Sequence, residues 1–286
     1  MSVVLSRRPR TIQIYLPSGD PSGIRQAELT TSIVRVFEVP RNQVSEFLAM
    51  PESSQVGLYF LVGGEDLSEL YIGQSGSVGH RLGQHNKDSS KEWDRALVVV
   101  SLTQNLTQTH VLYLESVSIE KAKRYERYKL INGNSGSLPY TPKPLQADCE
   151  DIHETAALLL TTLGYPIFEP LIADEKRSDT EKLFCTRSGV KGEGFYTNEG
   201  LVVLKGSEGR FVPPNGKIRE SFIRVRDRLI NDGVFGVEGE KTVVLKDHLF
   251  KSPSAASFAL VAAPSNGWID WKTLSGQTLS DIERTE

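Results

Sequence analysis

Two strand-like runs joined by a short polar turn constrain this chain more than any other feature. Residues 56–85 read VGLYFLVGGEDLSELYIGQSGSVGHRLGQH, with VGLYFLVGG and SELYIGQS on either side of the turn. Apolar runs flanked by turn residues predict an antiparallel strand pair, and SVGHRLGQHNK then predicts a helix. A hairpin centred on Glu65 would place Tyr59 opposite Tyr71, so that both rings share one face of the sheet.

Four polar side chains are expected to converge on this hairpin and helix. Arg81 and His85 lie four positions apart, so they share one face of the helix with each other. Arg is a forked, permanently charged donor for phosphate, and Tyr or His can accept a proton from water when a cation lowers the pKa of the tyrosine. The alternative is a Tyr59–Tyr71 pair that only stabilises the hairpin, with Arg81 and His85 on a solvated helix face.

A lone carboxylate stands out in the longest helix predicted for the first half of the chain. We expect Asn105 to cap this helix, with Gln108 as its reciprocal partner. Glu115 lies among apolar neighbours in the stretch HVLYLESVSI. A carboxylate in that position should reach toward water, pair with a cation such as Arg81, or bind a metal.

The order of the segments predicts a protein with both helices and strands, an α/β (α+β) fold. We expect a β-rich extension over residues 1–50 and a domain with a small mixed or antiparallel sheet flanked by helices over 51–146. A helical connector over 147–178 and a second α+β domain over 179–286 should follow. The stretches NGNSGSLPYTPKPLQ and ADEKRSDTEK, which are rich in Gly, Ser and Pro or in polar residues, mark the breaks.

Net charge limits how the chain can contact nucleic acid. The formal charge is −3, which argues against a surface that binds polyanions everywhere, so local basic groups must supply any such contact. Lys87, Lys91 and Arg95 follow the hairpin and helix closely. Arg224 and Arg228 lie in the basic stretch KIRESFIRVRDRL. These five residues are the candidate nucleic-acid contacts.

The lengths of the apolar runs and the positions of the cysteines indicate where in the cell the protein is located. No apolar run reaches the roughly 18 residues that a membrane span needs, so no membrane partner is expected. Cys149 and Cys185 are far apart and show no metal-ligand spacing. Reduced thiols in a cytoplasmic protein are the simplest interpretation.

The motifs of the hairpin resemble those of the GIY-YIG nuclease superfamily, which includes homing endonucleases, some restriction enzymes and the incision subunit of bacterial excision repair. GLY at 57–59, eleven intervening residues and YIG at 71–73 agree with the family in order and spacing, as do Arg81 and His85. The resemblance covers about residues 56–135 and implies the GIY-YIG nuclease fold for that part.

The resemblance also implies a set of roles. Glu115 matches the glutamate that binds one divalent metal, Mg²⁺ or its substitute Mn²⁺, and Arg81 would contact the scissile phosphate. Tyr59 would relay a proton from the attacking water and Tyr71 would orient the phosphate, although the two roles are exchangeable. His85 would assist a tyrosine or the water.

A family Asn after the helix is the last element of the motif. The stretch NGN offers Asn132 and Asn134, and Asn132 is favoured because it lies nearer the end of the helix.

The implied activity is metal-dependent hydrolysis of DNA in restriction, defence or repair, with RNA not excluded. Cutting both strands from one site would require a homodimer or two successive nicks. The alternatives are a catalytically idle nucleic-acid-binding adaptor on a nuclease scaffold, and a structural interaction protein.

The end of the chain carries a second resemblance. The stretches GFYTNEGLVVLKGS, SPSAA and NGWIDWKTLSGQTL are similar to an uncharacterised domain that often follows this nuclease type, and to small adenine-methylase-associated modules thought to contact DNA. A DNA- or partner-binding role is therefore expected for residues 179–286.

Overall fold

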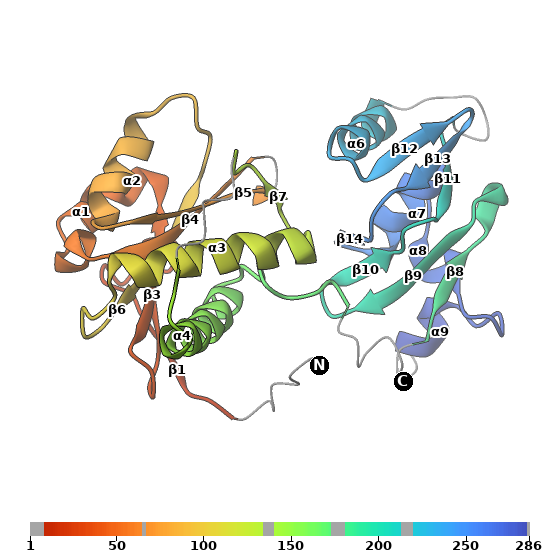
Figure 1. Cartoon of the computed structure of the whole chain (residues 1–286). Helices are drawn as coiled ribbons and strands as arrows, with labels where there is room; N and C mark the ends of the chain where they lie inside the picture. The colour runs from red at the N-terminus through yellow and green to blue at the C-terminus, as the bar shows by residue number, and fades with distance from the viewer. Residues whose placement is uncertain (1–8, 65–66, 134–139, 173–180, 213–219, 285–286) are drawn as a thin grey trace. The chain divides into compact units, whose positions relative to one another are not determined.

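The chain forms two compact units, Met1–Glu169 and Pro170–Glu286, in the computed structural model (Figure 1). The structure describes residues 9–64, 67–133, 140–172, 181–212 and 220–284. Both units combine sheets with flanking helices, which confirms the predicted α+β class. Among the described residues, no helix has both the length and the apolar character that a membrane crossing requires.

The first unit is built on one seven-stranded sheet in the order β1-β2-β3-β6-β4-β5-β7. Neighbouring strands are antiparallel except for the short parallel pair of β5 with β7. The elements in chain order are β1 (Ile12–Tyr15), β2 (Arg25–Leu29), β3 (Val34–Pro40), η1 (Arg41–Gln43), α1 (Val44–Leu48), η2 (Pro51–Ser54), β4 (Gly57–Gly63), β5 (Glu69–Ser75), α2 (Val78–Lys87), β6 (Arg95–Ser101), α3 (Gln108–Tyr125), β7 (Lys129–Leu130) and α4 (Lys143–Thr162).

The N-terminal strands and α4 belong to this unit rather than flanking it. Strand β3 pairs with β6 along its full length, so residues predicted as an extension over 1–50 lie inside the sheet. Helix α4 packs on α3, β2 and β3, although part of it was predicted as a connector over 147–178. The physical reason is burial: apolar strand faces lose contact with water only when a helix covers them.

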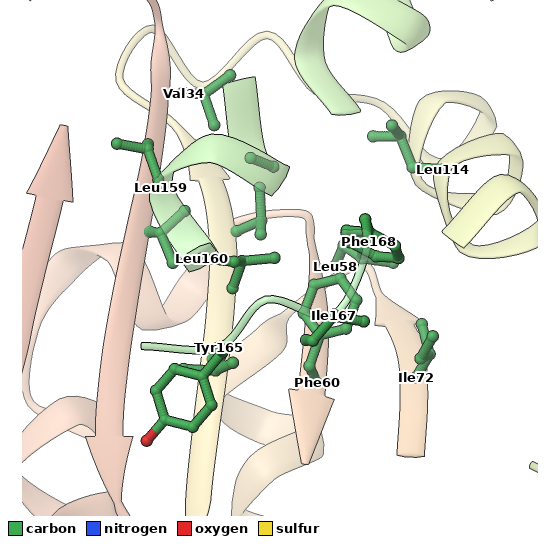
Figure 2. Packing of buried hydrophobic residues seen from close by; sticks show 14 of the residues in the cluster. Val34, Leu58, Phe60, Ile72, Leu114, Leu159, Leu160, Tyr165, Ile167 and Phe168 are labelled. Atoms are coloured by element: carbon green, nitrogen blue, oxygen red, sulfur yellow. The ribbon is translucent and has the colours of Figure 1, made fainter. Parts of the chain in front are cut away.

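Side-chain alternation sends successive residues of β4 to opposite faces of the sheet. Leu58 and Phe60 point into a core shared with α3 and α4, which Figure 2 shows beside Leu159, Leu160 and Phe168. Tyr59 and Leu61 point to the other face, into a core with Val78 and Leu82 of α2 and with Phe47 of α1. Each fully buried apolar side chain contributes about 1.5–3 kcal/mol to folding.

The hairpin register differs from the predicted one by two residues. Tyr59 lies opposite Gly73, and Tyr71 lies opposite Leu61. The Tyr59–Tyr71 pairing predicted from a turn centred on Glu65 is therefore wrong, and Glu65 itself lies outside the described residues. Because sheet faces alternate with a period of two, the shift leaves both tyrosines on the same face.

The start of α3 also differs from the prediction. Thr107, not Asn105, is the N-cap, and its side chain and that of His110 form the capping box. Asn105 instead accepts a hydrogen bond from Ser101 Oγ at 2.8 Å. Asn and Thr are both good caps, so residue type did not separate the two positions.

The second unit contains a five-stranded sheet, β14-β10-β9-β8-β15, and a three-stranded sheet, β11-β13-β12. Trp271 is fully buried in its core. The elements are β8 (Leu183–Cys185), η4 (Arg187–Gly189), β9 (Gly192–Thr197), β10 (Gly200–Val203), β11 (Glu208–Arg210), α6 (Glu220–Asn231), β12 (Phe235–Glu238), β13 (Lys241–Val244), β14 (His248–Phe250), α7 (Pro253–Val261), α8 (Gly267–Asp270), β15 (Trp271–Lys272) and α9 (Leu279–Glu283).

Candidate active site

Tyr59 is the innermost member of the predicted cluster. Its side chain is 1% exposed, and its hydroxyl lies 2.9 Å from Nε2 of His85 on α2. The hydroxyl lies directly over Gly73, where an added Cβ would be 2.4 Å from Tyr59 Oη. Gly73 is therefore the residue of β5 that leaves room for the phenol. Burial raises the pKa of Tyr59 above its ordinary value, while the hydrogen bond from Arg81 acts in the opposite direction.

Tyr71 and His85 complete an aromatic group around Tyr59. The ring centroids of Tyr71 and Tyr59 are 6.3 Å apart, and those of Tyr71 and His85 are 5.5 Å apart. Tyr71 is only partly buried, and Nζ of Lys91 lies 4.3 Å from its ring centroid. Tyr71 is thus the tyrosine nearer to solvent, at a cation–π distance from a lysine.

Arg81 bridges the two tyrosines from the exposed side of α2. Its guanidinium lies close to both tyrosines, and the interaction with Tyr59 is the main reason that the pKa of Arg81 is raised. Nη1 of Arg81 also donates to Gln84 Oε1 at 2.8 Å. The residue is exposed, so the guanidinium is accessible to a ligand while it contacts the buried phenol.

His85 is neutral at physiological pH in this setting. The residue is 3% exposed. Burial, followed by the charges of Lys91 and Arg81, lowers the pKa of His85 to about 4. The structure therefore brings together Tyr59, Tyr71, Arg81 and His85, as the sequence predicted, and adds Lys91.

Glu115 lies at the outer edge of β5. The residue is half-buried. Burial raises the pKa of Glu115, while the nearby backbone N–H of Gln74 acts in the opposite direction. Among the described residues, no cation contributes to that pKa, so the predicted pairing with Arg81 is not the arrangement found. Gln74 directly follows Gly73 in the chain. The Tyr59 hydroxyl and the Glu115 carboxylate thus lie near consecutive residues of β5.

Asn132 binds the same edge of β5 at Ile72, two residues before Gln74. Its Oδ1 accepts from Ile72 N at 3.0 Å, and its Nδ2 donates to Ile72 O at 2.7 Å. Both functional groups of the amide are engaged with one backbone residue, so Asn132 supports the strand that carries Gly73 and Gln74. The other candidate, Asn134, lies outside the described residues.

The candidate nucleic-acid contacts of the first unit occupy three different environments. Lys87 is exposed at the end of α2. Lys91 lies within the cluster, against Tyr71 and His85. Arg95 is 3.9 Å from the Glu38 carboxylate.

The two candidates of the second unit lie on α6. Arg224 is exposed, and Arg228 is 3.8 Å from Asp232 Oδ2. The neighbouring Lys217 and Arg219 lie outside the described residues.

Two features of the site were missed by sequence reasoning. The role of Gly73 follows from a cross-strand pairing that the predicted register did not contain. The contact of Lys91 with His85 was not expected, although a basic residue soon after the predicted helix was the available signal. No group of three or more His, Cys, Asp or Glu side chains that could hold a metal occurs in the described part of the chain.

Comparison with known proteins gives one finding. A family model described as "Domain of unknown function (DUF4357)" matches residues 183–283. The matched segment falls within the second unit and outside the cluster around Tyr59. No curated protein and no solved structure matches the chain.

Proposed function

We propose that the first unit is a metal-dependent endonuclease of the GIY-YIG type that hydrolyses DNA, in restriction, defence or repair. The observation that carries the proposal is the placement of the Tyr59 hydroxyl and the Glu115 carboxylate at the consecutive residues Gly73 and Gln74. The phenol approaches β5 from the face covered by α2, and the carboxylate comes from α3, which packs on the other face. An exposed guanidinium, Arg81, contacts the same phenol.

Each side chain has a role that follows from its contacts. Arg81 is exposed and permanently charged, so it would bind the non-bridging oxygens of the phosphate, where charge gathers during in-line attack. A tyrosine would accept the proton of the attacking water as the new P–O bond forms and the P–O3′ bond breaks. Tyr59 remains the first choice because it carries the contacts from Arg81 and His85. Tyr71, which is nearer to solvent, would orient the phosphate.

Glu115 is suited to hold a hard divalent cation. A half-buried carboxylate whose pKa is raised by burial gains most from an added positive charge. Mg²⁺ is bound through one or two carboxylates and keeps several waters, so a single glutamate is an adequate protein ligand, and Mn²⁺ is the expected substitute. The ion would offset the negative charge on the leaving 3′-oxygen.

A second candidate function is a nucleic-acid-binding adaptor that no longer cleaves. The observation that favours it is the burial of Tyr59, which raises the pKa of the phenol and disfavours the phenolate needed as a base. This candidate predicts DNA binding that depends on Arg81 without any Mg²⁺-dependent cleavage.

Cleavage assays distinguish the two candidates. Supercoiled, linear, branched and single-stranded DNA, with an RNA of matched sequence, would be incubated with the full chain with and without Mg²⁺ or Mn²⁺. We expect cleavage that Arg81→Ala and Glu115→Gln abolish. Arg10→Ala and Glu120→Gln, which alter exposed residues, should retain it. Mg²⁺-dependent cleavage by purified Arg81→Ala would falsify the proposed role of Arg81.

Metal binding can be measured without DNA. We expect Mg²⁺ to raise the Tm of the wild-type chain, because a ligand that binds only the folded state stabilises it. Glu115→Gln should lose this shift, and Glu120→Gln on the same helix should keep it. An equal Mg²⁺ shift in wild type and Glu115→Gln would place any cation elsewhere.

The second unit would contribute to DNA or partner binding, and the exposed Arg224 on α6 supports phosphate contact. A homodimer would let a one-site enzyme cut both strands, which sedimentation on DNA can measure. The buried, unpaired thiols of Cys149 and Cys185 support the further proposal of a cytoplasmic location.

A further inference from the structure

Lys91 occupies a position that is fixed by its surroundings. Its backbone carbonyl accepts a hydrogen bond from Arg41 Nη1 at 3.1 Å, and the Arg41 guanidinium lies 5.0 Å from the ring centroid of Trp93. The side chain is partly buried. Its Nζ lies 3.3 Å from Nδ1 of His85 and 4.3 Å from the ring centroid of Tyr71. The lysine is therefore held against two members of the site.

The chemistry of the two nitrogens decides where the proton of His85 lies. A lysine ammonium has three donors and no acceptor, so it can hydrogen-bond only to a nitrogen that carries a lone pair. Neutral imidazole has one such nitrogen, and its other nitrogen bears the proton. A lone pair on Nδ1, opposite Lys91, leaves the proton on Nε2, and Nε2 is the atom that faces Tyr59 Oη at 2.9 Å.

We infer that Lys91 is a positioning residue that holds neutral His85 with its proton on Nε2, so that His85 donates to the Tyr59 hydroxyl and does not accept from it. The charged and titratable groups around His85 are consistent with a neutral ring. Lys91 and Arg81 disfavour a positive imidazole, and Asp88, the C-cap of α2, opposes them. The remaining neighbours, Tyr59 and Tyr71, are phenols.

The consequence for Tyr59 is that its oxygen receives a hydrogen bond from His85 Nε2, with the positive charge of Arg81 close by. Both groups favour negative charge on that oxygen and so act against burial, which still raises the pKa of Tyr59. His85 with its proton on Nε2 has no lone pair toward Tyr59, so it cannot take a proton from it. In the proposed reaction, on which this consequence rests, the proton of the attacking water would end on a Tyr59 phenolate.

The position of the proton can be measured directly by ¹H–¹⁵N correlation NMR of the full chain above the pKa of His85. The five histidines can be assigned by adding the His85→Gln variant. We expect the neutral His85 ring to carry its proton on Nε2. In Lys91→Met, the form with the proton on Nδ1 should become populated, and the pKa of His85 should rise from about 4 toward its ordinary value.

Two control variants accompany this measurement. Lys91→Arg also presents donors only, so it should keep the proton on Nε2. Lys87→Met removes an exposed lysine nearby and should change neither readout. A proton on Nδ1 in the wild-type chain overturns the inference without any variant. An unchanged proton position in folded Lys91→Met also overturns it.

This experiment uses no DNA, so its failure differs from a failure of the proposed function. If the proton is on Nε2 but no nucleic acid is cleaved with Mg²⁺, the proposed function fails and the inference about Lys91 stands. If DNA is cleaved, a cleavage rate that rises through the alkaline ionisation of a tyrosine supports the inference. A rate that follows the loss of a proton from His85 near pH 4 contradicts it.

Discussion

The hydroxyl of Tyr59 occupies the space that a side chain at Gly73 would need. An added Cβ would lie 2.4 Å from Tyr59 Oη and 2.5 Å from Cζ of the same ring. Tyr59 is 1% exposed and is packed among the side chains of α2 and β6. The two residues therefore constrain each other.

Gly73→Ala should therefore destabilise the first unit and displace the Tyr59 ring. We expect a loss of about 1–3 kcal/mol in the free energy of unfolding, as for other overpacked cores. Gly83→Ala is the matched control, because its Cβ would meet Leu48 Cδ1 at an ordinary 3.7 Å and Ala favours a helix. Urea unfolding with m-values measures both variants. Equal stability of Gly73→Ala and wild type would show that the ring can move.

Removing the Asn132 side chain should expose the backbone of Ile72 to hydrogen exchange. Asn132→Ala leaves the N–H and C=O of Ile72 without the partners found at 3.0 and 2.7 Å, at an expected cost of about 1–3 kcal/mol. The Ile72 amide should exchange faster, whereas the Phe60 amide in the middle of the sheet should keep its protection. Unchanged protection at Ile72 would contradict the assigned support of β5.

His85 should make the folded state less stable as the pH falls. Its pKa is about 4 in the fold and 6.5 ordinarily, so between these values the unfolded chain binds more protons. The stabilising contribution of the neutral ring is complete above about pH 6.5 and is lost as the pH falls to about 4. Other buried histidines act in the same direction, so the difference between wild type and a His85 variant isolates this effect.

The measurement is the free energy of unfolding of wild type and His85→Gln across pH 4 to 7. The variant should lose less stability than wild type over this interval. His80→Gln, an exposed change on the same helix, is the control and should follow the wild-type curve. Parallel curves for wild type and His85→Gln would mean that His85 is protonated normally in the fold.

Two arginines of α6 should respond differently to substitution. Arg226 lies 4.2 Å from the ring centroid of Phe211 and donates to Phe211 O at 3.3 Å, so Arg226→Ala should cost about 1 kcal/mol of stability. Arg224 is exposed, and Arg224→Ala should leave stability within about 0.5 kcal/mol. If the second unit contacts DNA, Arg224→Ala should weaken binding and reduce its salt dependence. Thermal unfolding and salt-dependent binding assays measure these effects.

The faces of the hairpin residues were predictable, and their register was not. Alternation placed Tyr59 and Tyr71 on one face whichever residues were paired. Gly63 pairs with Glu69, so the hairpin is centred one residue later than Glu65. Gly64 and Leu67 in the connection both have positive φ values, and a Leu in that conformation is not signalled by residue type.

The other predictions failed where residues far apart in the chain come into contact. Nothing in the spacing of residues 34–40 indicates that β3 joins β6, because the partners are far apart in the chain. Glu115 was singled out as a lone carboxylate among apolar neighbours. The polar group that acts on its pKa is the backbone N–H of Gln74 and not Arg81. Sequence pattern selects unusual residues more readily than it finds their partners.

Strand β5 also determines how this sheet meets other polypeptides. Beyond its short pairing with β7, the outward N–H and C=O of Ile72 are occupied by the side chain of Asn132. An exposed strand edge is a common route to aggregation and to peptide capture by strand addition. Here an incoming strand would first have to displace the Asn132 amide, so the side chain that supports β5 also protects this edge against unwanted self-association.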